Sequence, residues 1–151
     1  MRVAIADKPF SADSMLAQFA DSRTGAAGAL ASFVGYCRDV SDAGDVHQLQ
    51  LDHYPGLTEA EITRLANTII ERHGLIDLLV VHRVGVVTPN EPIVLVAALS
   101  SHRAQAFAAV AELMDYLKTD APFWKREAGS GGERWIEPTD ADRARRAALG
   151  E

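Results

Sequence analysis

Residues 93–103 are the most informative stretch of this 151-residue chain: Ile93-Val-Leu-Val-Ala-Ala-Leu-Ser-Ser-His-Arg103. The continuous apolar run Ile93–Leu99 predicts a buried strand. Because serines are favoured helix N-caps, Ser100 and Ser101 predict that a long helix begins directly after the strand and ends near Lys118. The pattern in this helix predicts an inward face made of Ala104, Phe107, Ala108, Ala111 and Met114.

Another long helix precedes that strand. Thr58 and Glu61 have the spacing of a capping box, and Gly74 is a typical helix stop. Between them runs one apolar stripe: Ile62, Leu65, Ala66, Ile69 and Ile70. After Gly74 we expect a buried strand at Leu75–Val81, which Val84–Val87 either continues or pairs with, and a turn at Thr88–Glu91.

The remaining elements are shorter. Toward the N-terminus we expect strands at Val3–Ala6, Gly28–Arg38 and Val46–Tyr54, a helix at Ser11–Asp21 and a polar loop at Asp39–Asp45. Toward the C-terminus, Phe123–Ala128 and Glu133–Glu137 form a predicted hairpin around Gly129–Gly132. Strands and helices intermix without strict alternation, which predicts an α+β fold. No repeat or long linker divides the chain, so we expect one domain over 1–137 and a charged tail with a helical pattern over 138–151.

Composition excludes several classes of protein. The net charge of −6 argues against a nucleic-acid partner, and no apolar run is long enough to span a membrane. A single cysteine, Cys37, excludes an internal disulfide and a cysteine-built zinc site, and the histidine spacings do not suggest a metal site. With no secretory pattern at the N-terminus, these features predict a cytoplasmic protein.

The lysines are unusually few. Twelve of the fifteen basic residues are arginines, and two of the three lysines, Lys118 and Lys125, lie seven residues apart. A lysine beside aromatic side chains and other cations loses its proton more easily, which makes it a usable base or nucleophile. The alternative is that Lys118 only complements the end of a helix.

A second basic group lies at the predicted start of the long helix. Free backbone N–H groups there favour an anion, and His102 and Arg103 add donors at the same point. The alternative is that the serines only cap the helix and Arg103 pairs with an acid. Cys37 lies in an apolar strand and is expected to be inert, and Gly129–Gly132 is a turn rather than a phosphate loop. His82-Arg83-Val84-Gly85 is either an anion contact at a strand end or simply an arginine paired with an acid, and we favour the pairing.

Five motifs in one register resemble a known family. They are Gly28-Ala-Leu-Ala-Ser-Phe-Val-Gly-Tyr-Cys-Arg-Asp39, His53-Tyr-Pro-Gly56, His82-Arg-Val-Gly85, Ser101-His-Arg103 with Ala106-Phe107, and Tyr116-Leu-Lys-Thr-Asp-Ala-Pro-Phe-Trp-Lys-Arg-Glu127. In this order the motifs are similar to those of the large, catalytic subunit of molybdopterin synthase. The resemblance runs from about Gly28 to Glu137.

The resemblance implies a fold and an activity. The fold would be a hammerhead-like α+β domain with a mixed sheet. The activity would be sulfur transfer in molybdenum cofactor biosynthesis. Two sulfur atoms would be added to cyclic pyranopterin monophosphate and would form the dithiolene of molybdopterin. The sulfur would come from a small ubiquitin-like sulfur-carrier subunit whose C-terminal Gly-Gly tail ends in a thiocarboxylate. No metal or other cofactor would be needed, and a homodimer would bind one small subunit at each end as a heterotetramer.

The resemblance also implies roles for particular residues. Lys118 would be the central catalytic residue, as base, acid or transient covalent partner, and Lys125 would assist it. The anionic end of the substrate would be held by Arg38, His102 and Arg103. The pocket would be lined by Tyr36, Cys37, Arg126 and Glu127, with Phe33 and Met114 as walls or core residues.

The predicted length of the second long helix adds a geometric expectation. About 15 residues separate His102-Arg103 from Lys118, which corresponds to roughly 22 Å along a helix. A substrate about 10 Å across does not bridge that distance (a size estimated from bond lengths). If both ends belong to one site, it combines residues of two subunits.

The chain departs from the family pattern at two points. Cys37 stands where the family usually has valine, and no basic residue follows the Trp135-Ile-Glu137 strand in register. Arg143, Arg145 or Arg146 is a candidate replacement for that contact. Two other functions stay open: a non-catalytic binding protein with the same fold, and a phosphate-binding hydrolase that uses His102 as its base.

Overall fold

The strands form two sheets in the computed structural model, which describes residues 1–150. The four-stranded sheet has the order β1 (Arg2–Ala6), β5 (Asp77–Arg83), β7 (Pro92–Ser100) and β2 (Ala29–Tyr36). Only its β1–β5 pair is parallel. The second, antiparallel sheet has the order β3 (Val40–Ser41), β4 (Gly44–His53), β8 (Phe123–Gly129) and β9 (Gly132–Ile136), with β6 (Gly85–Val87) also paired to β4.

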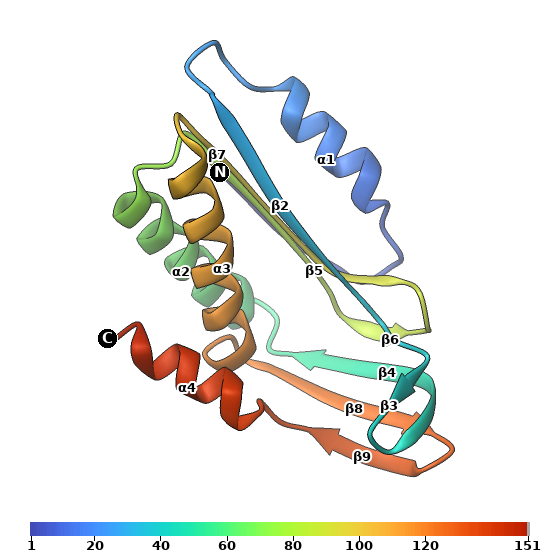
Figure 1. The fold of residues 1–151 in the computed structure, drawn as a ribbon. Coiled ribbons are helices and arrows are strands. Elements are labelled where there is room, and N and C mark those ends of the chain that lie inside the picture. The colour runs from blue at the N-terminus through green and yellow to red at the C-terminus, as the bar shows by residue number, and fades with distance from the viewer. Residues whose placement is uncertain (151) are drawn as a thin grey trace.

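Helices cover both faces of the four-stranded sheet (Figure 1). Helix α1 (Ala12–Asp21) lies on one face, and α2 (Leu57–His73) and α3 (Arg103–Thr119) lie on the other. Helix α4 (Asp140–Ala148) lies against the C-terminal part of α3. The α+β class, the two long helices and the C-terminal hairpin are therefore confirmed. No helix within residues 1–150 is long and apolar enough to cross a membrane.

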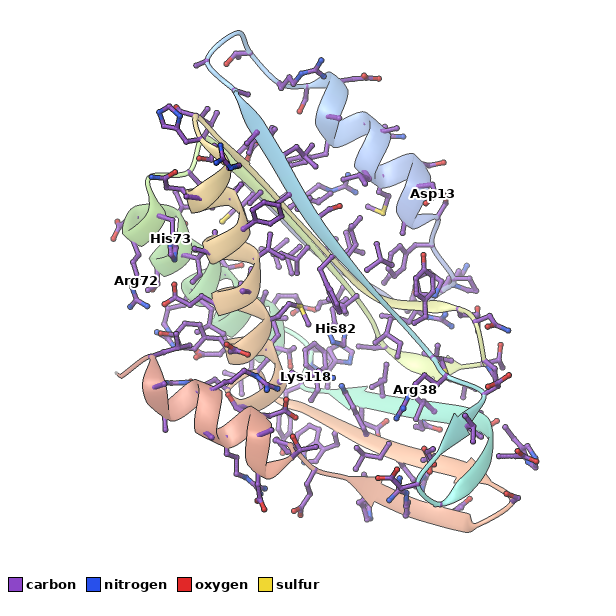
Figure 2. All side chains as sticks on the ribbon, viewed as in Figure 1. Asp13, Arg38, Arg72, His73, His82 and Lys118 are labelled. Carbon is purple, nitrogen blue, oxygen red and sulfur yellow. The ribbon has the colours of Figure 1, made fainter. Side chains whose placement is uncertain are left out.

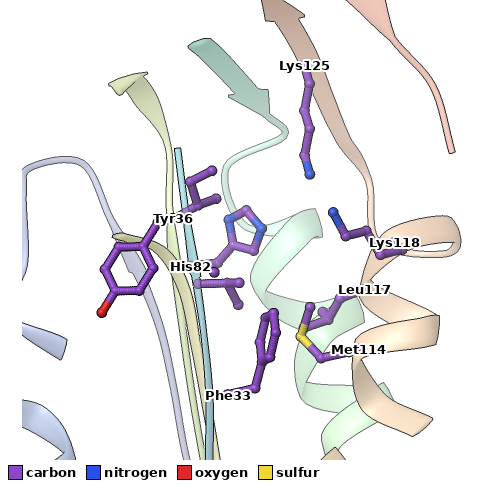
Figure 3. A pocket seen from close by; sticks show the side chains of 10 residues that line it. Phe33, Tyr36, His82, Met114, Leu117, Lys118 and Lys125 are labelled. Carbon is purple, nitrogen blue, oxygen red and sulfur yellow. The ribbon is translucent and has the colours of Figure 1, made fainter. Parts of the chain in front are cut away.

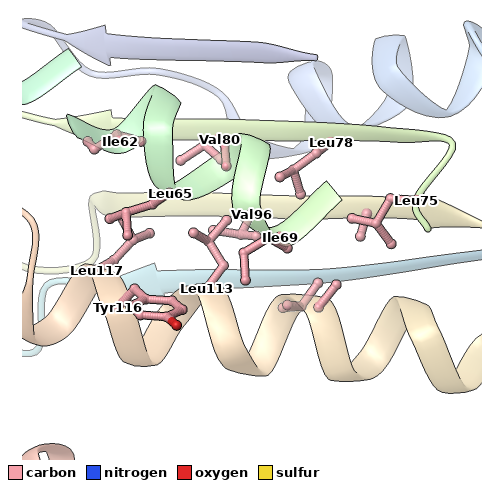
Figure 4. Packing of buried hydrophobic residues seen from close by; sticks show 14 of the residues in the cluster. Ile62, Leu65, Ile69, Leu75, Leu78, Val80, Val96, Leu113, Tyr116 and Leu117 are labelled. Atoms are coloured by element: carbon pink, nitrogen blue, oxygen red, sulfur yellow. The ribbon is translucent and has the colours of Figure 1, made fainter. Parts of the chain in front are cut away.

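The main core lies between α2, α3 and the four-stranded sheet (Figure 4). Ile62 and Ile69 of α2, Leu113 of α3, and Val80 and Val96 of the sheet are all fully enclosed there. Burying each such side chain contributes roughly 1.5–3 kcal/mol to folding. This core fixes α3 on the sheet and so determines where the C-terminal end of α3 lies.

The inward face predicted for α3 is wrong. The buried residues are Ala106, Ala109, Val110, Leu113, Tyr116 and Leu117, whereas Phe107 is 66% exposed. Because α3 is apolar around most of its circumference, its pattern contains two apolar faces and does not say which one meets the sheet. The helix consequently leaves Ala104, Phe107, Ala108 and Ala111 on the surface of this chain.

Both predicted helix caps are displaced. Helix α2 begins after Gly56, whose N–H donates to the Glu59 carboxylate at 2.5 Å, while Thr58 bonds to Tyr54 N and Pro122 O. At α3 the N-cap residue is His102, and the Ser100 hydroxyl bonds to the backbone of His102. Gly74 does end α2, with a positive φ of 61°.

Two connections also differ from expectation. The predicted loop Asp39–Asp45 contains β3, which forms a tight hairpin with the start of β4. The Val84–Val87 segment neither continues β5 nor pairs with it, because β6 pairs with β4 in the other sheet. This chain path from β5 into β6 joins the two sheets and creates the angle between them (Figure 1).

Candidate active site

A pocket opens where the two sheets meet, beside the C-terminal end of α3 (Figure 3). Figure 2 shows Lys118, His82 and Arg38 around this junction. Apolar side chains form most of the wall, and two amines, an imidazole and a tyrosine hydroxyl are its polar side-chain groups. The lining residues are Phe33, Gly35, Tyr36, His82, Ile93, Val94, Met114, Leu117, Lys118 and Lys125.

The two lysines reach the pocket from neighbouring elements. Lys118 lies in the last turn of α3, and Lys125 is the third residue of β8. The short connection between them is held in place, because the Thr58 hydroxyl donates to the Pro122 carbonyl at 3.1 Å and the Phe123 ring stacks on His82 at 3.9 Å. The two amino groups point toward each other in the pocket (Figure 3).

The lysine pair has an unusual electrostatic environment. Burial, followed by the positive charge of Lys118, lowers the pKa of Lys125 to about 8. Within residues 1–150 neither amine forms an ion pair with a carboxylate, although the chain carries a net charge of −6. At neutral to mildly alkaline pH, Lys125 is therefore available both as a base and as a proton donor.

A second cleft adjoins the pocket and shares Tyr36, Ile93, Lys118 and Lys125 with it. Arg38 and Glu127 line this cleft. Glu127 is buried, which alone would raise its pKa, but hydrogen bonds from Arg134 (2.9 Å) and Ser41 (2.8 Å) hold that pKa below its usual value. The Glu127 charge is thus already paired, so the cleft presents mainly the cations of Arg38 and the lysines.

The structure brings five of the predicted site residues together and separates four others from them. Tyr36, Arg38, Lys118, Lys125 and Glu127 line the joined clefts, and so do Phe33 and Met114. Cys37 is 1% exposed and packs in the core of the second sheet, where burial raises the pKa of its thiol. Arg126 lies over the Trp135 ring, 5.8 Å from its centroid, outside both clefts.

His102 and Arg103 lie at the far end of α3. His102 caps the N-terminus of this 17-residue helix and Lys118 lies in its last turn, so the two are about 22–24 Å apart along the axis. Both His102 and Arg103 are exposed. No single chain places them at the lysine pair. Of the three arginines that follow β9, Arg143 pairs with Glu137 and Asp140, Arg145 with Asp115, and Arg146 with Asp120.

His82 is a pocket residue that was not predicted. The sequence placed it only beside Arg83, which does pair as expected, with Glu91 at 3.4 Å and with the Val86 carbonyl at 2.7 Å. The sequence held one signal for His82: it directly follows a run of buried apolar residues, and a polar side chain at that position of a core strand is a candidate site residue. Only the contact with Phe123, 41 residues later, turns that position into a pocket floor.

These features define an α+β domain with an apolar pocket whose two amines pair with no carboxylate within residues 1–150. The family model described as "MoaE protein" matches residues 5–120. The chain is 46% identical to the molybdopterin synthase catalytic subunit of Cereibacter sphaeroides, covering 95% of this chain and 97% of that protein. It is also 46% identical to that of Caulobacter vibrioides, with 95% and 93% covered.

Solved structures share this fold. The molybdopterin biosynthesis MoaE protein from Burkholderia ambifaria has a TM-score of 0.81 and 40% identity, with 99% of this chain and 97% of that one covered. A Helicobacter pylori structure, described as a complex of subunits 1 and 2 of molybdopterin-converting factor, has a TM-score of 0.73 at 19% identity, with 91% and 90% covered. The chain belongs to the MoaE family of molybdopterin synthase catalytic subunits, and it is an enzyme subunit of molybdenum cofactor biosynthesis.

The lowered pKa of Lys125 has a measurable effect on stability. Below pH 8 folding buries a cation, which destabilises the native state, so Lys125→Met is expected to raise the free energy of unfolding at pH 7 by about 2 kcal/mol. Between pH 8 and the ordinary lysine range, the unfolded wild type binds more protons than the native protein. Wild-type stability therefore rises with pH there, and the advantage of the variant shrinks.

Urea unfolding at pH 7 and pH 10, at one fixed protein concentration, measures this difference. Lys8→Met is the control, because Lys8 is exposed between β1 and α1 and does not line the pocket. An equal gap between wild type and Lys125→Met at both pH values would contradict the lowered pKa.

Proposed function

We propose that the chain transfers sulfur to cyclic pyranopterin monophosphate and thereby forms the dithiolene of molybdopterin. Each of the two sulfurs would come from the thiocarboxylated Gly-Gly C-terminus of a small ubiquitin-like subunit. The observation that carries this proposal is the lysine pair: two amines, with Arg38 beside them, line one cleft without a carboxylate partner. A cyclic phosphate supplies the missing negative charge.

The chemistry requires an anion site and mobile protons. When the cyclic phosphate opens, its oxygen leaves the carbon that takes the sulfur, and the resulting charge needs a nearby cation. We assign that role to Lys118 and Arg38. Lys125, with a pKa of about 8, would exchange protons with the reacting carbons and oxygens. The thiocarboxylate sulfur would bond to the carbon that the phosphate oxygen leaves and form a thioester with the tail, and water would then cleave the thioester, so that the sulfur stays on the substrate and the tail leaves as a carboxylate. The apolar walls formed by Phe33 and Met114 would limit the access of water to the thiocarboxylate before that step.

The second cleft is a suitable entry for the tail of a sulfur carrier. It runs from exposed Val40 of β3, past Ser41 and Ile136, to the two lysines. A Gly-Gly end lacks side chains, so it can lie extended in a narrow groove and present its terminal thiocarboxylate to the amines. The two-subunit description of the Helicobacter pylori relative supports a small partner for this chain as well.

A homodimer would complete the site. Phe107, Ala111 and Met114 of α3 form an apolar groove with Phe33 of β2, and β2 is an edge strand of its sheet. We propose that a second copy covers this groove with its own α3 running in the opposite direction. That arrangement would bring His102 and Arg103 of the second copy to the lysine pair of the first, as donors for the substrate's anionic end.

The test is to combine the purified protein, cyclic pyranopterin monophosphate and a thiocarboxylated small subunit, and to look for the dithiolene product by mass spectrometry. Product is expected only when all three are present, and a small subunit ending in an ordinary carboxylate should give none. Absence of product despite measured binding of the small subunit would favour a non-catalytic binding protein. Turnover of the substrate without the small subunit would instead favour the hydrolase.

A further inference from the structure

The floor of the pocket is a buried histidine that the proposed reaction has not used. His82 is the penultimate residue of β5, is 4% exposed and lies flat against the Phe123 ring, with an interplanar angle of 17°. The two lysine amines project into the pocket beside its ring (Figure 3). An apolar side chain would pack equally well against Phe123, so packing alone does not explain an imidazole here.

The ring is held in one tautomer. Its Nδ1 lies 2.8 Å from the Arg83 carbonyl oxygen, which accepts a hydrogen bond and so requires a proton on Nδ1. Burial, and then the positive charge of Lys125, lowers the pKa of His82 to about 3, so the ring is neutral at physiological pH. A neutral imidazole with its proton on Nδ1 carries a lone pair on Nε2. Within residues 1–150, Nε2 has no hydrogen-bond partner.

The lysine pair lacks an acceptor. Each amine carries at least two N–H donors, and no carboxylate within residues 1–150 pairs with either of them. The nearby acids are already engaged: Glu127 by Arg134 and Ser41, and Asp142 by Thr139 and Arg145. Of the other pocket walls, Phe33, Val94 and Leu117 have no side-chain acceptor, and the Tyr36 hydroxyl points away from the lysines (Figure 3). Nε2 of His82 is thus the acceptor available at the pocket floor.

We propose that His82 is a positioning residue for the lysine pair: its unprotonated Nε2 accepts a hydrogen bond from the Lys125 amine and holds that amine toward the substrate. This inference rests on the proposed function for its catalytic consequence. The hydrogen bond needs neither substrate nor small subunit: it forms when the flexible Lys125 side chain turns its amine onto Nε2, beside which it lies unbonded in this structure (Figure 3). The titratable groups that face the ring are Lys125 on β8, Lys118 on α3 and His53 on β4. A charged imidazole would add a further cation to the two lysines, which is why a buried, neutral ring suits this position.

A matched pair of variants tests the proposal. His82→Phe keeps a ring against Phe123 but has no acceptor, whereas His82→Gln places an amide oxygen near the position of Nε2. With three lysines in the chain, a protein labelled with 13C- and 15N-lysine gives few amine signals, and Lys8→Arg identifies one of them. The titration of Lys125 can therefore be followed by NMR in each variant, without substrate or partner.

In His82→Phe the ammonium form of Lys125 loses its acceptor, so its titration midpoint should fall by about 0.5–1 pH unit. The turnover rate should fall about tenfold or more with little change in KM, and His82→Gln should recover most of both effects. Equal shifts in the two variants, no shift in His82→Phe, or an unchanged turnover rate in His82→Phe would each overturn the proposal.

The wild-type protein provides a measurement that does not depend on variant folding. The 15N shift of His82 Nε2 should be that of an unprotonated ring nitrogen and should change with the same midpoint as Lys125. A proton on Nε2, or a 15N shift of Nε2 that does not change when Lys125 titrates, would overturn the proposal. If wild-type protein transfers no sulfur while these titrations behave as expected, the proposed function fails and the hydrogen bond stands.

Discussion

If the proposed function is right, replacing Lys118 by alanine is expected to lower the rate of dithiolene formation by at least about 10²–10³-fold. Two effects combine. The variant loses the cation that would stabilise the opening phosphate, and Lys125 loses the neighbouring charge that helps to lower its pKa, so less of it is neutral at pH 7. The measurement is the initial rate of product by mass spectrometry, with saturating thiocarboxylated small subunit.

Folding should not account for this loss. Lys118 is exposed, and within residues 1–150 it pairs with no carboxylate, so thermal unfolding should change little. Lys8→Ala is the matched control, because it removes an exposed lysine far along the chain from the pocket and should keep the wild-type rate. A Lys118→Ala protein that kept more than about a tenth of the wild-type rate would contradict a central role for Lys118.

Lys118→Arg separates charge from amine chemistry. Arginine keeps the positive charge but does not release a proton near neutral pH, and its guanidinium is larger than an amine and planar. If Lys118 acts only as a cation, the Lys118→Arg variant should recover much of the rate. If Lys118 acts as a base or forms a covalent bond through its nitrogen, the variant should remain as slow as Lys118→Ala.

The sequence predicted most elements because their signals are local. In the apolar run Ile93–Leu99, Val94–Leu99 is buried in β7 and Ile93 is partly buried, and Gly74 ends α2 as expected. The face of α3 was wrong for a physical reason: a helix with two apolar faces carries two burial signals, and only the three-dimensional structure assigns one to the core. The unassigned face, with Phe107 at its centre, is the one that a second subunit would cover.

Helix caps and site residues were likewise predicted where their signal is local in the sequence and missed where it depends on distant residues. Thr58 has the sequence of a capping residue, but its hydroxyl bonds to Pro122, 64 residues away, and such long-range partners leave no local pattern. Lys118 and Lys125 were found because a seven-residue spacing brings them together through one short turn. His82 was missed because its role depends on Phe123 and on both lysines, which reach it from two other elements.

Mixed dimers made from two inactive variants should recover activity if the site is shared between subunits. Lys118→Ala and Arg103→Ala chains, co-expressed with different tags and purified through both, form dimers of one known composition. In a shared site, the intact Lys118 of one chain meets the intact Arg103 of the other, so one of two sites works and the rate is about half that of wild type. Each variant alone should be inactive, and a fully active Arg103→Ala dimer would contradict a role for Arg103.

The reciprocal dimer makes the result unambiguous. A wild-type chain paired with a chain that carries both substitutions has no complete shared site, because each site then lacks either Lys118 or Arg103. If instead each chain builds its own site, this dimer keeps one intact site, and the first mixed dimer has none. The two models therefore predict opposite results in both dimers. The 17 residues of α3 are the reason to expect the shared arrangement, since they hold His102 and Arg103 more than 20 Å from Lys118 of the same chain (about 1.5 Å per residue).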